Sequence, residues 1–491
     1  MRFIKIIFLI YCSVYFPIYG NSQIAFRKVY SNNGYDYGQG IVQLADSSYV
    51  ICGSSSSFLD GPSQAFLLKI DSLGNYIWSN HYGGSETDWG RRVLYHENTG
   101  FLVAGFTNSI GNGGYDAYLF KTDLSGQLLW EKSYGGSGWE RINDAVLTVD
   151  NGAFLVGESN STVNGDNDMY LLRTNVNGDT LWSKKLGGLG DDKALAVDRL
   201  NDSTYFVAGE TYITDSLLTK GFVLRIKDDG VIEWMDTLGS SGNYGVRGID
   251  LDVVSNKVSF VGWQQDTNDV YKNSMFGKLT YQGILDFEQV EIPSSGEKII
   301  EHLTNYGSQG KNYMCFRYFD ETSFNDGYDV GVSKVMAGLY WDGLITSINY
   351  PLEDEPGEII PTSDGGAIYV GYSTGIGIGG GNVYVMKIGP NDNFPLIEFN
   401  PVPFSLVGMD EQYITQTSSS LYPNPFNEKL TINTGFSQDT YFEVSDIYGK
   451  IITNGFFKDS ISILTGDWHS GIYFIKTVQG NQEFQFKSIK Y

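Results

Sequence analysis

Four evenly spaced tryptophans constrain the fold of this chain more than any other feature. They are Trp78, Trp130, Trp182 and Trp234, each 52 residues after the one before. An aromatic residue continues the series on both sides, at Phe26 and, after 53 residues, at Phe287. A longer sixth unit follows, and a degenerate seventh copy starts near Ser347. Self-similarity at a fixed period of this length indicates one structural unit that is repeated and packs against its neighbours.

Each copy is expected to form four short strands separated by turns. In the copy that starts at Trp130, the expected strands are Trp130–Tyr134, Ala145–Val149, Ala153–Val156 and Met169–Thr174. Turn signals bound them at Gly135-Gly136, Asp150-Asn151-Gly152, Gly157 and Asn177-Gly178. Four strands per copy at a period near 50 are typical of a β-propeller, in which each sheet buries its faces against the next. We therefore expect an all-β, seven-bladed propeller over residues 23–394, with the recurring aromatic as a wedge between blades.

The ends of the repeat array predict how the ring closes. Phe26–Tyr30 matches Trp130–Tyr134 in phase, whereas the last copy has strands at Ala367–Val370 and Val383–Lys387 but no good outer strand after Gly389. We therefore expect Phe26–Tyr30 to complete the last blade. Such a clasp leaves no open edge strand. The count is seven blades if the degenerate copies are real, and six or eight otherwise.

Some of the repeat motifs resemble a known group of proteins. Tyr-Gly-Gly-Ser segments at Tyr82–Ser85 and Tyr134–Ser137, and the Asp-Gly-Gly turn at Asp364–Gly366, resemble the tandem propeller repeats of many secreted bacterial proteins. The resemblance covers residues 26 to 394 and implies the fold. It says almost nothing about activity, because propellers host unrelated functions.

The start of the chain predicts export. A basic beginning with Arg2 and Lys5 precedes an apolar run from Ile6 to about Ile18, and small residues follow up to Ser22. This is the pattern of a secretory signal peptide, expected over residues 1–22. A retained membrane anchor is the weaker alternative, because the run is too short to span a bilayer. No transmembrane segment is expected in the mature chain.

The net charge and the cysteine content argue against a nucleic-acid partner and against a disulfide framework. The formal net charge is −24, so a nucleic-acid partner is not expected, because phosphates would be repelled. After signal-peptide cleavage only Cys52 and Cys315 remain. Two distant thiols do not make a disulfide framework, and both are expected to be small buried residues.

The end of the chain has a different character. Residues 395–417 contain Pro401 and Pro403 and are expected to form a linker. Alternating strands are then expected over residues 418–491, which predicts a small β-sandwich. The expected strands are Lys429–Asn433, Tyr441–Ser445, Gly471–Thr477 and Gln482–Lys487.

Motifs in this segment resemble the type A sorting domain of the type IX secretion system. They are Leu421-Tyr-Pro-Asn-Pro-Phe426, Asp446-Ile-Tyr-Gly-Lys450 and Gly471-Ile-Tyr-Phe-Ile-Lys476, with a lysine near the end at Lys487 or Lys490. The resemblance implies a Bacteroidetes-type cell, partnership with that secretion machinery, and a protein released or held at the outer cell surface. The residues that carry the motif are Tyr422, Pro423, Asn424, Pro425, Gly449, Gly471 and Tyr473. An ordinary adhesive sandwich is the alternative.

Aligning the copies on the wedge aromatic reveals a column of carboxylates ten residues later. Its members are Asp36, Asp88, Glu140, Asp192 and Glu297, and Tyr244 breaks the series. This position precedes the innermost strand, so the carboxylates are expected around one mouth of the central channel. There they could bind a cation such as calcium, or a cationic or sugar ligand. The alternative is that each carboxylate accepts hydrogen bonds within its own loop.

A second column is basic and lies on the third strand of each blade. Its members are Lys69, Lys121, Arg173, Arg225, Lys278, Lys334 and Lys387. Its even recurrence favours a repeated ion pair with a carboxylate, or a solvated strand face, over a ligand site.

No catalytic constellation is recognised. The four histidines, His81, His96, His302 and His469, are scattered without metal-ligand spacing, and no nucleophile elbow, phosphate loop or paired-cysteine site is found. We therefore expect no catalytic residue and no cofactor other than a possible calcium ion. The leading hypothesis is a secreted or cell-surface binding or adhesion module for a glycan or a protein. An extracellular enzyme acting on polysaccharide or peptide through the carboxylate column, and a structural surface-layer component, are the alternatives.

Overall fold

The structure is a computed structural model. It describes residues 25–31, 34–58, 61–162, 165–239, 241–293, 296–306, 311–319, 328–336, 341–348, 354–374, 380–390, 402–403, 420–422, 428–433, 440–446, 450–458, 460–479 and 482–490. The predicted signal peptide lies outside these residues. The chain divides into two compact units, residues 1–407 and 408–491, which are described separately. In the described part of the chain, no helix has the length and hydropathy needed to cross a membrane.

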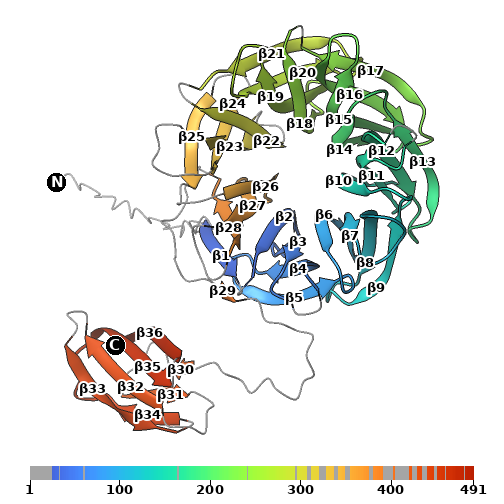
Figure 1. The fold of residues 1–491 in the computed structure, drawn as a ribbon. Helices are drawn as coiled ribbons and strands as arrows, with labels where there is room; N and C mark the ends of the chain where they lie inside the picture. Colours follow the sequence, from blue (N-terminus) through green and yellow to red (C-terminus); the bar gives the residue numbers. More distant parts are fainter. Residues whose placement is uncertain are drawn as a thin grey trace, which may run out of the picture. The chain divides into compact units, whose positions relative to one another are not determined.

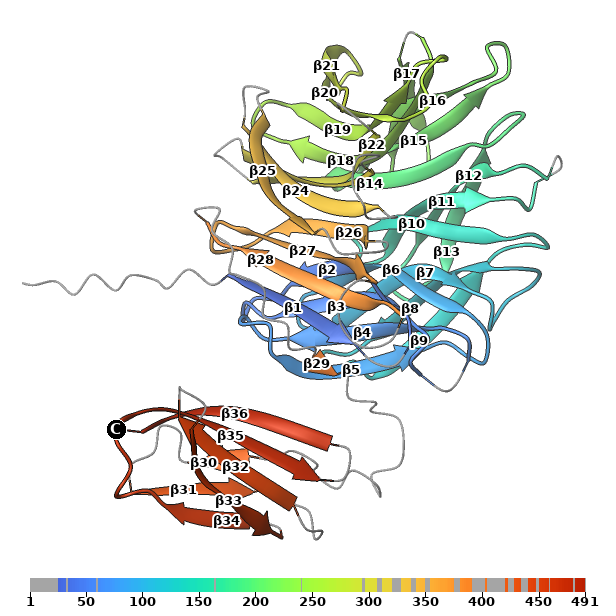
Figure 2. The same ribbon diagram turned by 60° about the vertical axis from the view of Figure 1, so that its left-hand side comes forward.

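The first unit is a ring of antiparallel sheets around a central channel (Figures 1 and 2). Six of its sheets have four strands in chain order, and the first strand of each lies nearest the centre of the ring. The first three are β2 (Asp36–Gln43), β3 (Tyr49–Ser55), β4 (Gln64–Ile70) and β5 (Tyr76–Tyr82); β6 (Asp88–His96), β7 (Gly100–Thr107), β8 (Asp116–Thr122) and β9 (Leu128–Tyr134); and β10 (Glu140–Leu147), β11 (Ala153–Ser159), β12 (Asp168–Thr174) and β13 (Thr180–Leu186). The next three are β14 (Lys193–Asn201), β15 (Thr204–Ile213), β16 (Leu218–Lys227) and β17 (Ile232–Leu238); β18 (Asn243–Asp252), β19 (Lys257–Gln265), β20 (Asn273–Thr280) and β21 (Leu285–Glu291); and β22 (Glu297–Tyr306), β23 (Lys311–Phe319), β24 (Asp329–Met336) and β25 (Trp341–Ile348).

A five-stranded sheet closes the ring, so that seven sheets surround the channel in the described residues. Its order is β26 (Asp354–Pro361), β27 (Ala367–Ser373), β28 (Asn382–Ile388), β1 (Phe26–Ser31) and β29 (Val402–Pro403). β1 pairs antiparallel with β28, with Phe26 opposite Lys387 and Tyr30 opposite Val383. The predicted clasp between the two ends of the array is confirmed. β29 lies in the segment expected to be a linker, and it pairs in parallel with the outer edge of β1.

Packing between sheets explains why the period is so regular. Each wedge aromatic lies on an outermost strand, directly opposite a residue of the basic column; Trp78, for example, is opposite Lys69. Its ring lies over the turn glycine of the next sheet: a Cβ on Gly126 would be 2.8 Å from Trp78. Gly126 also has a φ of +81°, which glycine adopts without strain. The same contact recurs between Phe26 and Gly74, Trp130 and Gly178, Trp182 and Gly230, and Trp234 and Gly283.

The core between sheets is apolar and closely packed. Val50 and Cys52 of one sheet pack with Val93, Phe101 and Phe120 of the next, and equivalent clusters recur round the ring. Cys52 and Cys315 are both buried and free, as expected. Burial raises the pKa of the Cys52 thiol to about 12, so this group is unreactive at neutral pH.

The second unit is a sandwich of two antiparallel sheets. One contains β30 (Ser420–Tyr422), β31 (Lys429–Asn433) and β34 (Ser460–Leu464), and the other contains β33 (Ile451–Phe457), β32 (Thr440–Asp446), β35 (Gly471–Gln479) and β36 (Gln482–Lys490). Leu430 and Ile432 of the first sheet share a core with Phe442 and Val444 of the second.

Three of the sorting-motif residues lie in the described strands β30 and β35. Tyr422 ends β30 and Gly471 begins β35. The ring of Tyr473 lies 5.0 Å from that of Trp468, and its hydroxyl donates a 2.8 Å hydrogen bond to the carbonyl oxygen of His469. Pro423, Asn424, Pro425 and Gly449 lie outside the described residues.

Candidate functional site

The carboxylate column lies at the start of the innermost strands, and most of it is buried. Glu140 is fully buried: its Oε1 accepts a 2.6 Å hydrogen bond from the Ser159 hydroxyl, and its Oε2 accepts a 2.9 Å bond from the Gly136 amide. The same hydroxyl contact joins Asp36 to Ser55, Asp88 to Thr107, and Asp192 to Thr211. Glu297 is half-buried and accepts a 3.1 Å hydrogen bond from the Tyr328 hydroxyl. This geometry supports the structural interpretation of the column, because the oxygens are occupied by the protein itself.

The basic column forms ion pairs with a different set of carboxylates. Arg173 lies 2.7 Å from Asp150, Lys278 lies 3.0 Å from Asp252, and Lys387 lies 2.9 Å from Asp364. Each of these aspartates lies at the turn between the first and second strands of the same sheet. A repeated structural pair was one of the two expected roles of the basic column. Arg173, Lys278 and Lys387 pair with a turn aspartate, whereas Arg225 pairs with Glu233 of β17 at 2.7 Å.

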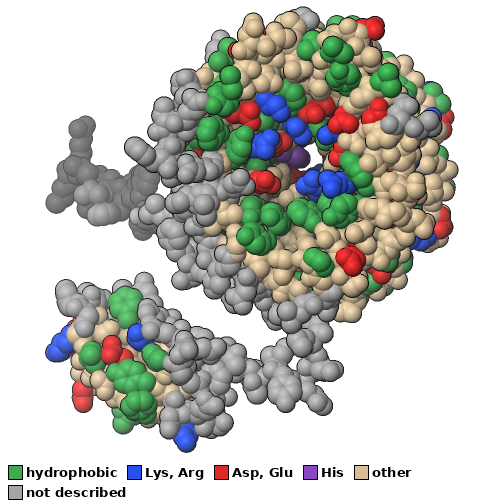
Figure 3. Space-filling view, in the orientation of Figure 1, with side chains coloured by type: hydrophobic (Ala, Val, Ile, Leu, Met, Phe, Trp, Pro, Cys, Tyr) green, Lys and Arg blue, Asp and Glu red, His purple; other side chains and the backbone are tan. Residues whose placement is uncertain are grey.

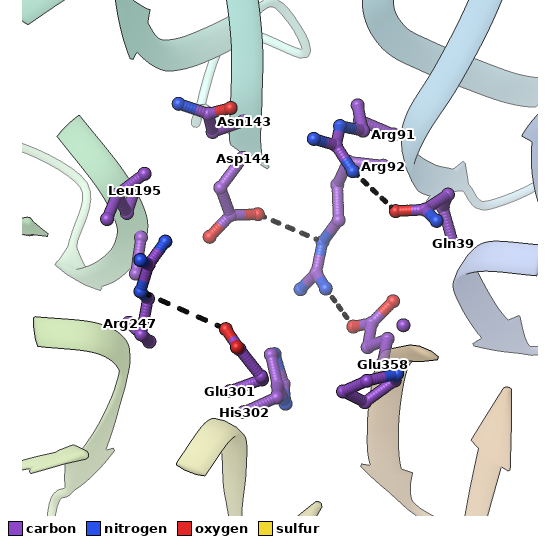
Figure 4. Close-up of a pocket in the computed structure, with 13 residues that line it drawn as sticks. Gln39, Arg91, Arg92, Asn143, Asp144, Leu195, Arg247, Glu301, His302 and Glu358 are labelled. Carbon is purple, nitrogen blue, oxygen red and sulfur yellow. Dashed lines mark hydrogen bonds and ion pairs between the residues drawn. The ribbon is translucent and has the colours of Figure 1, made fainter. Parts of the chain in front are cut away.

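A β-bulge in each innermost strand lines the channel, and no sequence pattern predicted it. In β6 the register shifts between Gly90 and Arg92, which leaves Arg91 unpaired in the ladder. The equivalent bulged residues in the seven innermost strands are Gln39, Arg91, Asn143, Leu195, Arg247, Glu301 and Gly357. All seven line one cavity of about 170 Å³ inside the channel (Figure 4). We call this part of the channel its waist. The first five are 52 residues apart, so the period was the signal that could have found them.

Ion pairs cross the waist of the channel (Figure 4). The Nε of Arg92 lies 3.4 Å from Asp144, and its Nη1 contacts Glu358. Arg247 lies 3.1 Å from Glu210 and 4.0 Å from Glu301. Each of these carboxylates therefore forms an ion pair with an arginine of another sheet.

Two of the waist carboxylates also bind the inner edge of the following sheet. Asp144 accepts a 2.9 Å hydrogen bond from the Val197 amide, and Glu358 accepts a 2.8 Å bond from the Ile41 amide. Beside them, burial lowers the pKa of His302 to about 3, with a smaller contribution from the positive charge of Arg92. His302 is therefore neutral at physiological pH.

An aromatic row extends along one side of the channel above the waist. Tyr37 stacks on Tyr372 at 4.1 Å and lies 5.1 Å from Trp89, which stacks on Phe106 at 5.6 Å. Phe106 lies 5.3 Å from Tyr115, edge to face. Hydrophobic side chains gather along the rim of the channel near β2 and β6, next to Lys and Arg side chains (Figure 3).

Two arginines adjoin this row. The guanidinium of Arg141 lies 4.9 Å from the centre of the Trp139 ring and 5.0 Å from that of Tyr115. The guanidinium of Arg91 lies 5.9 Å from the centre of the Trp89 ring, and it donates a 2.6 Å hydrogen bond to the amide oxygen of Gln39. The channel thus combines paired charges at its waist with aromatic residues and arginines toward one mouth.

Comparison with known proteins assigns the C-terminal unit. Residues 420–491 match the family described as the secretion system C-terminal sorting domain. No curated protein matches the chain.

Solved structures are similar to the ring at low identity. The β-propeller domain of the Trilobed protease from Pyrococcus furiosus aligns with a TM-score of 0.43 at 8% identity, covering 75% of this chain and 98% of that one. A puromycin hydrolase S511A mutant complexed with PGG aligns with a TM-score of 0.47 at 11% identity, covering 82% of this chain and 59% of that one. The α-L-arabinofuranosidase Arb93A from Fusarium graminearum aligns with a TM-score of 0.38 at 9% identity, covering 75% and 98%. The ring of sheets and the matched tail together identify the chain as an exported β-propeller protein that carries a C-terminal sorting domain of the type IX secretion system.

Proposed function

We propose that this protein is a binding or adhesion module outside the cell, and that its ligand enters the channel at the mouth near β2, β6 and β10. The observation that carries the proposal is a contrast between columns of the repeat. The wedge aromatics, the basic column and the buried carboxylates keep their chemical type in most sheets, with Tyr244 as an exception in the carboxylate column, because they serve packing and turn structure. The residues that face the channel change type at almost every step.

Two channel columns show this variation. One directly follows the carboxylate column and contains Tyr37, Trp89, Arg141, Lys193, Gly245, Lys298 and Glu355. The other is the column of bulged residues. A repeated scaffold whose inner surface carries a different side chain from each sheet presents an asymmetric site, as recognition of one ligand requires.

The rival interpretation is an enzyme that uses the carboxylate column. Acid–base chemistry needs carboxyl groups that reach the substrate and titrate differently. Asp36, Asp88 and Glu140 are fully buried and accept hydrogen bonds from hydroxyl groups on the adjacent strand of the same sheet, which argues against catalysis by these groups.

Glycan and protein arrays probed with the full mature chain test the proposal. A ligand is expected, and Trp89→Ala is expected to weaken its binding at least about tenfold, because Trp89 lies in the centre of the aromatic row. Leu129→Ala is the control, since Leu129 is 56% exposed on the outermost strand β9 and should have no effect. Absence of binding on the arrays, together with measured hydrolysis of a polysaccharide or peptide, would overturn the proposal. Binding that Trp89→Ala leaves unchanged would place the site elsewhere.

A further inference from the structure

We infer that Arg91 and Arg141 form a carboxylate-binding site, and that the carboxylate belongs to an acidic saccharide. This inference rests on the proposed binding function and specifies its ligand class. The two residues lie on the innermost strands of neighbouring sheets, Arg91 in β6 and Arg141 in β10.

Arg91 and Arg141 differ from the other channel arginines in lacking an acidic partner. Among the described residues, Arg92, Arg247 and Arg317 each lie within 4.0 Å of a carboxylate, whereas no carboxylate lies that close to Arg91 or Arg141. In the same part of the chain, the buried Nε atoms of both residues find no hydrogen-bond partner, as is also true of Arg92, Arg247 and Arg317, so it is the missing carboxylate that distinguishes the pair. The one side-chain acceptor that Arg91 has is the neutral amide of Gln39.

The electrostatics of this pair favour an added anion. Burial lowers the pKa of Arg91; the negative charge of Glu355 raises it, the positive charge of Arg141 lowers it, and Glu158 raises it by a smaller amount. Glu158 is opposite Arg141 in the β10–β11 ladder, but its ion pair is with Lys193, at 3.7 Å. Both side chains are partly exposed and their like charges repel one another, so a bound anion would reduce that repulsion.

The shape of the site favours a carboxylate. A guanidinium presents parallel N–H groups that match a planar carboxylate in a bidentate pair. The net charge of −24 repels acidic ligands at long range, but this repulsion is screened beyond about 8 Å at physiological salt.

The inner edge of the ring favours a saccharide over a peptide. A peptide that added to an innermost strand would need its free backbone N–H groups. On β2 and β14, the innermost strands of the two sheets that flank the arginine strands, the Ile41 and Val197 amides are already bonded to Glu358 and Asp144. By contrast, sugar hydroxyl groups need only scattered polar side chains, and Gln39 and Asn143 line the cavity beside Arg91.

Calorimetric titration of the full mature chain tests the inference. The probes are trigalacturonate, trimannuronate and the same trisaccharides after reduction of their carboxyl groups. We expect at least one acidic trisaccharide to bind and its reduced form to bind at least about tenfold more weakly. Arg91→Gln and Arg141→Gln should each reduce affinity for the acid by a similar factor, while Arg91→Lys, which keeps the charge but loses the planar fork, should reduce it less. Arg199→Gln is the control, because Arg199 is exposed on β14. Thermal melts establish that each variant is folded.

The outcomes separate the inference from the function on which it rests. Equal binding of the acidic and reduced forms, still sensitive to Trp89→Ala, would overturn the carboxylate site and leave the binding function in place. Binding of a glutamate-rich peptide but of no saccharide, lost in Arg91→Gln, would overturn the saccharide assignment. Saccharide binding that neither Trp89→Ala nor the arginine variants change would overturn both.

Discussion

One tyrosine hydroxyl joins neighbouring sheets at equivalent places round the ring. Tyr30 and Tyr82 donate 2.6 Å hydrogen bonds to the carbonyl oxygens of Gly74 and Gly126, the same turn glycines that the wedge aromatics cover. A buried hydrogen bond of this kind stabilises a protein by about 1 kcal/mol. Tyr82→Phe should therefore lower the free energy of unfolding by about that amount, measured by urea denaturation. Tyr35→Phe is the control, since Tyr35 is 51% exposed. Equal stability of Tyr82→Phe and wild type would contradict this role.

A pair of carboxyl groups on two neighbouring innermost strands makes stability depend on pH. Burial raises the pKa of Asp198 from 3.8 to about 7, and Asp250, 52 residues later in the next sheet, adds to the rise. The folded state thus holds this proton more tightly than the unfolded chain does. The resulting stability is fully present below about pH 3.8 and is lost as the pH rises through about 7.

The variant Asp198→Asn tests this linkage. It should raise the melting temperature at pH 8 by a few degrees and flatten its decline between pH 5 and pH 8, because it removes the repulsion with Asp250. Asp215→Asn, at an exposed turn, should keep the wild-type slope. An unchanged slope in Asp198→Asn would show that another group causes the decline.

At the scale of the hairpin, the glycine after each third strand serves both turn conformation and sheet packing. Gly178 has a φ of +76°, and a Cβ there would lie 2.7 Å from Trp130. Gly165 has the same φ but no atom within 4 Å of such a Cβ, so it is a matched control. Both alanine variants should lose about 1–2 kcal/mol from backbone strain. Gly178→Ala should lose a further 1–3 kcal/mol, roughly, because the ring must move. Denaturation curves in which both variants lose the same stability would mean that the wedge contact contributes nothing.

Strands were predictable from the sequence wherever local signals define them. The Asn177-Gly178 turn and the apolar run before it place β12 to within one residue. The innermost strand was harder: Ala145–Val149 was predicted, whereas β10 spans Glu140–Leu147, because charged residues that face the channel disguise the strand. The proximity of Arg91 and Arg141 could not be predicted, since it depends on a bulge and on the packing of two sheets. The two arginines belong to two different columns of the repeat. Each column recurs with the period, but its residues differ in type, so neither column stands out as a repeated motif.

On the scale of the whole molecule, ring closure depends on β1, which is more than 350 residues from its partner β28 in the sequence. Removing residues 23–31 should lower the melting temperature by about 10 °C or more, because it exposes the edge of β28 and removes Phe26 and Tyr30 from a sheet interface. The exposed edge should also promote oligomers, which light scattering would detect. Cutting the chain after Val407 is the matched deletion, since it removes the sorting domain and keeps β29. It should leave the melting of the ring within about 2 °C while abolishing export in a cell with type IX secretion. If the two truncated proteins have the same melting temperature, pairing of β1 with β28 is dispensable, and packing between sheets alone holds the ring closed.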